Sequence, residues 1–138
     1  MKPIQKIVVI GPESTGKSTL CAALSEHYQT TWTPEYARQY LSEHGTNYTY
    51  EDLLTIAKGQ IKNEEDAIAQ VQQKVEREAD QKNSPKLIVD TDMYVMKVWC
   101  EYVFQNAHTF ILEKINERKY DLYLLCDIDL PWAKDEMR

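Results

Sequence analysis

The sequence predicts an α/β fold in which helices cover both faces of a mostly parallel sheet. Two apolar runs of strand length, KIVVI and KLIVD, are each followed by a segment whose apolar residues recur at helical spacing. Strands that alternate with helices need crossover connections, and such connections produce parallel pairing. A glycine-rich loop, GPESTGKS, directly follows the first run. These observations predict a P-loop NTPase fold, and the length of 138 residues fits a single domain.

The first third of the chain reads as strand, helix and strand. Residues 6–10 are rich in β-branched side chains and end at Gly11, which is typical of a strand buried on both faces. Residues 18–28 carry apolar side chains at helical spacing. Residues 29–34 are β-branched and aromatic and end at Pro34, so we expect a second strand there.

Helices are expected in the middle of the chain. A short helix over 35–43 ends before Gly45. Thr49 and Asp52 have the spacing of a capping arrangement for a long helix that continues to about residue 81. One face of that helix is apolar and is formed by Leu53, Leu54, Ile56, Ala57, Ile61, Ile68, Val71 and Val75.

The remaining elements alternate again. Residues 84–85, Ser-Pro, end the long helix, and residues 86–90 form a third buried strand. Helices follow over 94–105 and 109–117. The apolar run over 122–126 is a fourth strand.

Charge and cysteine content restrict the classes of partner. A net charge of −6 gives no general attraction to nucleic acid or to an anionic membrane. Cys21, Cys100 and Cys126 are widely spaced and form no C-x-x-C pair, which favours reduced thiols. The apolar run near the N-terminus is too short for a signal peptide or a membrane span. We therefore expect a cytoplasmic protein without nucleic-acid or membrane partners, and a homo-oligomer is compatible with the sequence.

The glycine-rich loop fits the phosphate-binding pattern G-x-x-x-x-G-K-[ST] through Gly11, Gly16, Lys17 and Ser18. Glycines allow the backbone N–H groups to turn inward around an anion, and the following helix adds its N-terminal N–H groups. Lys17 would reach the β and γ phosphates, while the Ser18 hydroxyl would bind Mg²⁺. The alternative is an ordinary turn with a solvated lysine. We expect ATP and Mg²⁺ to bind here.

Two acids lie at the end of the third predicted strand. In LIVDTD, Asp90 and Asp92 are two residues apart, so their carboxylates share one side if the chain stays extended. Ligands of open α/β sheets bind at this end of the strands. One acid would bind the metal, and another would accept a proton from a hydroxyl nucleophile. Alternatively, Asp92 caps the next helix. An Asp-Glu pair of the kind used by mechanical ATPases does not follow this strand, which argues against a motor.

A second polar group follows the second predicted strand, in TWTPEYARQYL. Glu35 and Arg38 are three residues apart and therefore share a helical face, with Trp32 and Tyr36 nearby. A carboxylate, a guanidinium and aromatic rings suit a polar sugar with a flat ring. A surface ion pair beside core aromatic residues is the alternative.

Four stretches resemble a known family: GPESTGKSTL, PEYAR, IVDTDMYVMKVWCEY and YDLYLLCDIDLPWAKDEMR. They are similar to the bacterial nicotinamide riboside kinase domain of the NadR type, a P-loop kinase. The resemblance implies transfer of the γ-phosphoryl group of ATP to the 5′-hydroxyl of nicotinamide riboside, which yields nicotinamide mononucleotide for NAD synthesis. It also implies the strand order 2-3-1-4-5.

The resemblance also implies roles for individual residues. Residues assigned to ATP and Mg²⁺ binding are Gly11, Glu13, Ser14, Thr15, Gly16, Lys17, Ser18 and Thr19, with Asp90 as a further metal ligand. Residues assigned to the nucleoside are Glu35, Tyr36, Arg38, Asp92 and Trp132. Trp99 is a second candidate for ring stacking, although core packing explains it equally well. Arg138 begins a lid whose arginines neutralise charge, and either Asp90 or Glu35 is the base, with Asp90 preferred.

The family continues beyond residue 138 with the rest of the lid, a further helix and the fifth strand. The resemblance therefore implies a domain that lacks these parts, either as a fragment of a longer kinase or completed from elsewhere. Two alternative functions stay open. One is a kinase for another nucleoside or nucleotide, and the other is a regulator that binds ATP without turning it over.

Overall fold

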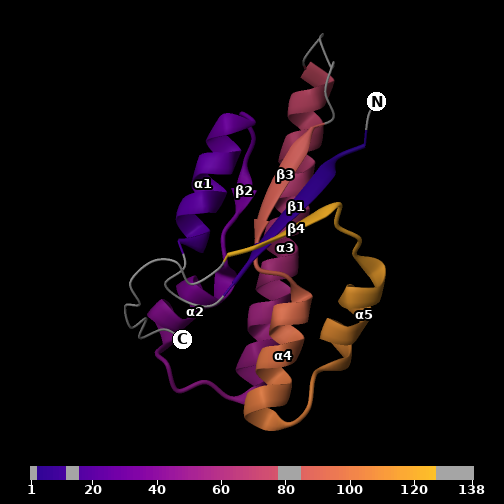
Figure 1. Cartoon of the computed structure of the whole chain (residues 1–138). Coiled ribbons are helices and arrows are strands. Elements are labelled where there is room, and N and C mark those ends of the chain that lie inside the picture. The colour runs from indigo at the N-terminus through magenta and orange to yellow at the C-terminus, as the bar shows by residue number, and fades with distance from the viewer. Residues whose placement is uncertain (1–2, 12–15, 78–84, 127–138) are drawn as a thin grey trace.

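The computed structural model describes residues 3–11, 16–77 and 85–126, which form alternating strands and helices (Figure 1). The elements are β1 (Gln5–Ile10), α1 (Lys17–His27), β2 (Trp32–Thr33), α2 (Tyr36–His44), α3 (Tyr50–Arg77), β3 (Lys86–Asp90), α4 (Met93–Phe104), α5 (Thr109–Glu117) and β4 (Leu122–Leu125). Among the described residues, no helix is both long and apolar enough to cross a membrane.

The strands form one parallel sheet in the order β2-β3-β1-β4. Val8 of β1 lies between Val89 of β3 and Tyr123 of β4. The predicted fold class and the order 2-3-1-4 are confirmed. This order brings the carboxyl ends of β1, β2 and β3 together on one edge of the sheet. At this edge the glycine-rich loop follows β1, Glu35 follows β2 and Asp90 ends β3.

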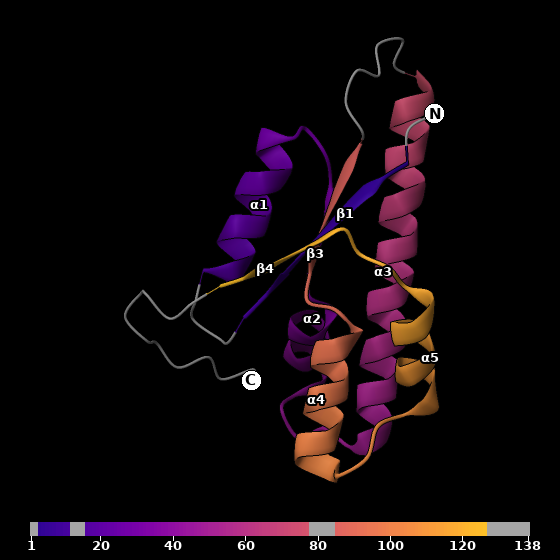
Figure 2. The ribbon, with the colours of Figure 1, turned by 45° about the vertical axis from the view of Figure 1, so that its right-hand side comes forward.

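Helices cover the two faces of the sheet (Figure 2). On one face, Val9 and Ile88 pack with Cys21 of α1. On the other face, Val8 and Val89 pack against α3, which contributes Ala67, Val71 and Val75. Successive residues of β1 and β3 therefore enter opposite cores, which explains why both runs are continuously apolar.

A third core contains no strand. It joins α2, the first half of α3, α4 and α5, which Figure 1 shows grouped below the sheet. Its fully buried members include Leu53, Ile56 and Ile111. α3 therefore packs on the sheet with its second half and on other helices with its first half.

A buried ion pair connects α3 with the segment before β4. Glu64 is 1% exposed and accepts hydrogen bonds from Arg118 at 2.8 Å and from the Tyr120 hydroxyl at 2.7 Å. Both carboxylate oxygens are thus satisfied, which a buried carboxylate requires. The pair fixes the entry of the chain into β4.

Three predicted boundaries need comment. The second strand was predicted over 29–34 but contains only Trp32–Thr33, because the turn after α1 uses the preceding residues. Gln29 has φ 53 and Thr30 donates its N–H to the Ser25 carbonyl at 2.8 Å. The long helix is described to Arg77, and residue 81 lies outside the described residues. The fourth strand ends at Leu125, one residue early.

The capping arrangement of the long helix is confirmed. The Asp52 carboxylate accepts the Thr49 N–H at 2.8 Å, and the Thr49 hydroxyl accepts the Asp52 N–H at 3.1 Å. This reciprocal pair satisfies two N–H groups at the start of α3. The Asp52 carboxylate also accepts the Tyr40 hydroxyl at 2.6 Å, which lowers the pKa of Asp52 and ties α2 to α3.

Candidate functional site

The two motif glycines occupy backbone positions that other residues would not tolerate. Gly16 has φ 77 and immediately precedes α1. A Cβ on Gly11 would lie 2.9 Å from both Cβ and the carbonyl oxygen of Cys126. Gly11 therefore permits the end of β1 to run against the end of β4, and Gly16 permits the turn into α1.

Lys17 lies at the first position of α1, and its ammonium group is surrounded by oxygen atoms. Nζ is 2.8 Å from Asp90 Oδ1, 3.0 Å from Thr91 Oγ1 and 3.5 Å from Glu35 Oε1. Lys17 is 7% exposed and Asp90 is fully buried. The start of α1, the end of β3 and the residue that precedes α2 thus meet at one cation.

Ser18 places its hydroxyl beside the same carboxylate. Its Oγ donates to Asp90 Oδ2 at 3.1 Å. A hydroxyl and a carboxylate are oxygen donors of the type that Mg²⁺ takes. Among the described residues, no group of three or more His, Cys, Asp or Glu side chains forms a metal site. Ser18 and Asp90 therefore fit a metal that takes its other ligands from water and phosphate.

Thr91 is a central residue that the sequence analysis missed. Its hydroxyl contacts Lys17 and lies 3.1 Å from both Glu35 Oε2 and Asp90 Oδ1. Its φ is 74, in the left-handed region that β-branched residues rarely adopt. Strained backbone of this kind persists where the surrounding structure enforces it. The only signal in the sequence was its position between the two aspartates.

The conformation of Thr91 corrects the expected geometry of the two aspartates. Because the chain is not extended at Thr91, the carboxylates of Asp90 and Asp92 contact different groups. Asp90 contacts Lys17 and Ser18, whereas Asp92 caps α4 by accepting the Val95 N–H at 3.2 Å. The alternative role of Asp92 as a helix cap is therefore confirmed.

The second oxygen of Asp92 has an unusual environment. Asp92 is 2% exposed, and Oδ2 is buried and makes no hydrogen bond of normal geometry among the described residues, although the Tyr123 hydroxyl is close enough to favour the ionised carboxylate. Burial raises the pKa of this carboxyl above its usual value. Burial and the nearby Asp92 charge also raise the pKa of Tyr123 to about 12. Asp92 thus lies toward β4, and its predicted contact with the nucleoside stays a prediction.

A cavity of about 280 Å³ opens beside the Lys17 cluster. Glu35, Gln60 and Thr91 form its polar end, and the rest of its wall comes mainly from apolar side chains of α2, α3 and α4. The apolar wall is formed by Ala37, Ile56, Val95, Met96, Val98, Trp99 and Tyr102. A molecule that fills this cavity would have its apolar part near α4 and its polar part at Glu35.

Trp99 both lines this cavity and packs in the helical core. Its indole N–H donates to the Tyr48 hydroxyl at 2.8 Å, and the two rings meet edge to face. The hydrogen bond fixes the orientation of the indole ring. The two interpretations of Trp99, stacking partner and core residue, are therefore compatible.

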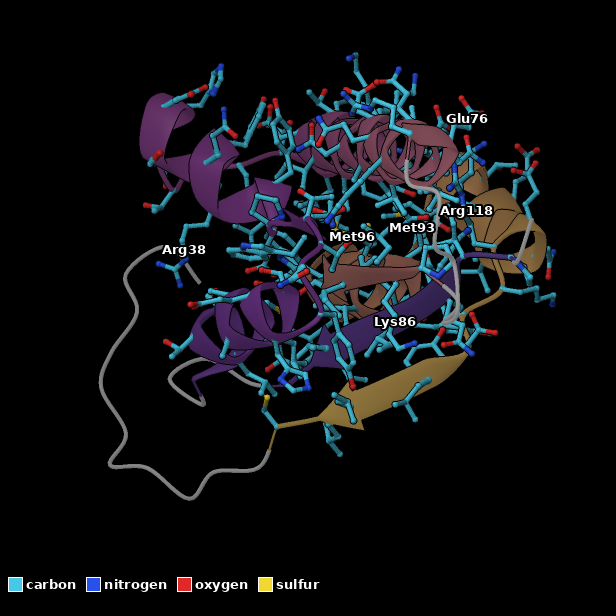
Figure 3. All side chains as sticks on the ribbon, turned by 90° about the horizontal axis from the view of Figure 1, so that it is seen from above. Arg38, Glu76, Lys86, Met93, Met96 and Arg118 are labelled. Carbon is cyan, nitrogen blue, oxygen red and sulfur yellow. The ribbon has the colours of Figure 1, made fainter. Side chains whose placement is uncertain are left out.

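Tyr36 and Arg38 occupy different environments although both follow Glu35. The Tyr36 ring lies against α3, where a Cβ on Gly59 would be 2.2 Å from a ring carbon. Arg38 is exposed, and Figure 3 shows it projecting from the periphery, whereas Met96 lies in the interior. The described cavity walls do not include Arg38.

Several predicted site residues lie outside the described residues. These are Glu13, Ser14, Thr15, Trp132 and Arg138. Thr19 is described and lies on the exposed side of the first turn of α1. Roles for these residues stay predictions.

The family described as "AAA domain" matches residues 6–138, which is almost the whole chain. The chain belongs to the AAA domain family.

Within the AAA domain family, the chain is similar to NadR. It is 29% identical over 140 residues to the trifunctional NAD biosynthesis/regulator protein NadR of Escherichia coli (strain K12). The same identity relates it to the protein of that name from Salmonella typhimurium. The alignment covers 98% of this chain but 31% of each relative, so the chain spans about a third of their length.

Solved structures of NadR share the fold. A NadR protein crystallised with NR, nicotinamide riboside, matches with a TM-score of 0.72 at 22% identity. A NadR protein crystallised with NAD and AMP-PNP matches with a TM-score of 0.67 at 21% identity. Each match covers 88% of this chain and 33% of the other chain. The resemblance to NadR stated from the sequence is confirmed.

Proposed function

We propose that this chain is an ATP-dependent kinase whose acceptor is the 5′-hydroxyl of nicotinamide riboside. One observation carries the proposal: Glu35 contacts Lys17 of the phosphate loop and also lines the neighbouring cavity. A phosphate donor and a hydroxyl acceptor would therefore meet at this carboxylate. The names of the NadR relatives and the ligands of the NadR crystals support the choice of nucleoside.

Lys17 would neutralise charge on the transferred group. In P-loop enzymes the lysine contacts the β and γ phosphates, and positioning with charge neutralisation supplies most of the acceleration. Lys17 is held by Asp90, Thr91 and Glu35, so ATP would compete with these oxygens for its ammonium group. Ser18 and Asp90 would hold Mg²⁺, which supplies further neutralisation of phosphate charge when bound.

Glu35 is the better candidate for the base. Both acids contact Lys17, but Asp90 does not line the cavity. Glu35 does line it, so the acceptor hydroxyl would reach this carboxylate first. Although the sequence slightly favours Asp90 as the base, we propose Asp90 for the metal and Glu35 for the proton.

The apolar wall of the cavity would hold the base of the nucleoside. Trp99 has its orientation fixed by Tyr48, and aromatic faces suit a flat ring. A pyridinium ring also carries a positive charge, which an indole face attracts. The polar end, at Glu35 and Thr91, would hold the ribose hydroxyls.

A coupled assay tests the proposal. The protein is incubated with ATP and Mg²⁺, and with nicotinamide riboside, adenosine, uridine or deoxycytidine in separate reactions, and ADP and phosphorylated nucleoside are quantified. We expect nicotinamide mononucleotide to be the preferred product. If only another nucleoside is phosphorylated, that nucleoside is the acceptor and nicotinamide riboside is not. If ATP binds and no product forms, a regulatory role is favoured.

Glu35→Gln tests the proton acceptor. We expect kcat to fall by about 10²- to 10⁴-fold, the usual contribution of general base catalysis, with Kd for ATP little changed. Glu43→Gln, on the exposed side of α2, serves as the control and should keep full activity. A Glu35→Gln enzyme with wild-type kcat would remove Glu35 from the mechanism.

A further inference from the structure

Gln60 is a buried polar residue to which neither the motif nor the resemblance assigns a role. It lies in the middle of α3 and is 4% exposed. Its side chain lines the cavity between Glu35 and Thr91. A buried amide must be hydrogen-bonded, so the partners of Gln60 indicate why the core contains it.

Both ends of the Gln60 amide are used, and each end holds a different part of the site. Oε1 accepts the Tyr36 N–H at 2.8 Å, which fixes the first residue of α2 directly after Glu35. Nε2 donates to the carbonyl oxygen of Asp90 at 3.2 Å and lies 3.4 Å from that of Thr91. One side chain thus joins the main chains that carry the two acids.

Gly59, the residue before Gln60, also helps to hold the start of α2 against α3. Gly59 lies inside α3, where glycine costs roughly 1 kcal/mol relative to alanine. The cost has a local reason, because a Cβ at this position would be 2.2 Å from the Tyr36 ring. Gly59 lets that ring lie against the helix, so the amide of Tyr36 reaches Gln60. Two adjacent residues therefore dock the start of α2 on α3.

From these contacts we infer that Gln60 is a positioning residue for phosphoryl transfer, an inference that rests on the proposed kinase function. It sets the separation of Glu35 from Asp90 and Thr91, and hence the arrangement of oxygens around Lys17. The reacting groups must be held within a fraction of an ångström for efficient transfer. Loss of Gln60 would therefore affect turnover more than ATP binding, since its hydrogen bonds among the described residues go to Tyr36, Asp90 and Thr91 and not to Lys17 or Ser18.

Gln60→Met tests this inference, because methionine has a similar length and cannot form either hydrogen bond. We expect kcat to fall at least about tenfold while KM for ATP changes less than about threefold. Gln72→Met, on the exposed side of the same helix, is the matched control and should behave as wild type. A Gln60→Met enzyme whose activity falls only in proportion to its folded fraction would overturn the inference.

A crystal structure of Gln60→Met separates this inference from the proposed function. If wild type phosphorylates no nucleoside, the kinase proposal fails. The position of Glu35 in the Gln60→Met crystal then decides whether Gln60 positions this acid. Displacement of Glu35, with loss of its 3.5 Å approach to Lys17, would support the positioning role. An unchanged Glu35 would overturn it.

Discussion

Lys17 of α1 and Asp90 of β3 form a buried ion pair in which Nζ lies 2.8 Å from Oδ1. The lysine is 7% exposed and the aspartate is fully buried, with Glu35 as a second acid at 3.5 Å. A buried cation between two acids lowers the cost of bringing those acids together. Lys17 therefore has a structural effect that is separable from phosphate binding.

Replacement of Lys17 should destabilise the fold as well as weaken ATP binding. In Lys17→Ala the acids Asp90 and Glu35 lose their common cation, and breaking a buried pair typically costs about 3–5 kcal/mol. Urea unfolding measures this change, and Lys17→Ala/Asp90→Asn should recover part of it. Lys62→Ala, from an exposed pair with side chains 75% and 58% accessible, should change stability by less than about 1 kcal/mol. Equal stabilities of wild type and Lys17→Ala would contradict the structural effect.

At Thr91 a glycine substitution should leave the protein more stable than an alanine substitution does, which is the reverse of the usual order. Both substitutions remove the hydroxyl, but glycine also removes the strain of a left-handed residue, about 1–2 kcal/mol. Thr91→Gly should therefore be more stable than Thr91→Ala, as measured by thermal unfolding. At Thr55, exposed inside α3, the ordinary ranking should hold, with alanine more stable by about 1 kcal/mol. A more stable Thr91→Ala would refute the strained backbone.

Asp92→Asn should stabilise the protein increasingly as pH rises. Burial raises the pKa of Asp92 in the folded protein above its ordinary value of about 3.9. Folding therefore favours the protonated carboxyl. The free energy of unfolding of wild type should fall as the pH rises from the ordinary pKa through the folded pKa. Asparagine keeps a cap without a charge, whereas Asp92→Ala loses the cap at a cost of about 1 kcal/mol. Unfolding free energies of the three proteins at several pH values measure this. A constant difference between wild type and Asp92→Asn would contradict it.

Gly59→Ala should destabilise the protein although alanine favours helices. The new Cβ would be 2.2 Å from the Tyr36 ring, so the start of α2 must move. Adding Tyr36→Ala removes the clash, and Gly59→Ala in that background should stabilise by about 1 kcal/mol. Thermal unfolding of the four proteins measures this reversal of sign. The same effect of Gly59→Ala in both backgrounds would mean that the ring is not the reason for the glycine.

Cysteine alkylation should report on the phosphate loop. Cys21 is fully buried, and burial, with the Asp90 charge, raises its pKa to about 12. Cys126 is partly exposed and lies against Gly11. We expect iodoacetamide to modify Cys126 first and ATP to slow that reaction, as measured by mass spectrometry. Equal modification of Cys21 and Cys126 would contradict the described burial.

The sheet, and the meeting of β1 with α1 at Lys17, could be predicted because their signals are local. The continuous apolar runs of β1 and β3 reflect burial on both faces, and the motif around Lys17 has a fixed spacing. β2 was predicted too long, because Gln29 and Thr30 form a turn that depends on contacts with Ser25 and Lys74. The residues that make these contacts follow no pattern that a short stretch of sequence would reveal.

The site was predicted in part for the same reason. Asp90 and Glu35 were identified because Asp90 ends one strand and Glu35 follows another. Thr91 and Gln60 were missed, because a threonine between two acids and a glutamine inside a helix have no distinctive pattern. Only the fold brings Gln60 to the Tyr36 amide and to the main chain of Asp90.

The separation of the three cores has a consequence for engineering. Lys17 belongs to α1, which packs on the sheet. Most of the cavity wall, in contrast, belongs to the strand-free core of α2, α3 and α4. Side chains on α4 such as Val98 can be exchanged without touching any residue that packs on β1. A library restricted to that wall would change the shape of the cavity and keep the residues around Lys17; if the proposed function is correct, it would alter the choice of acceptor and leave ATP binding unchanged.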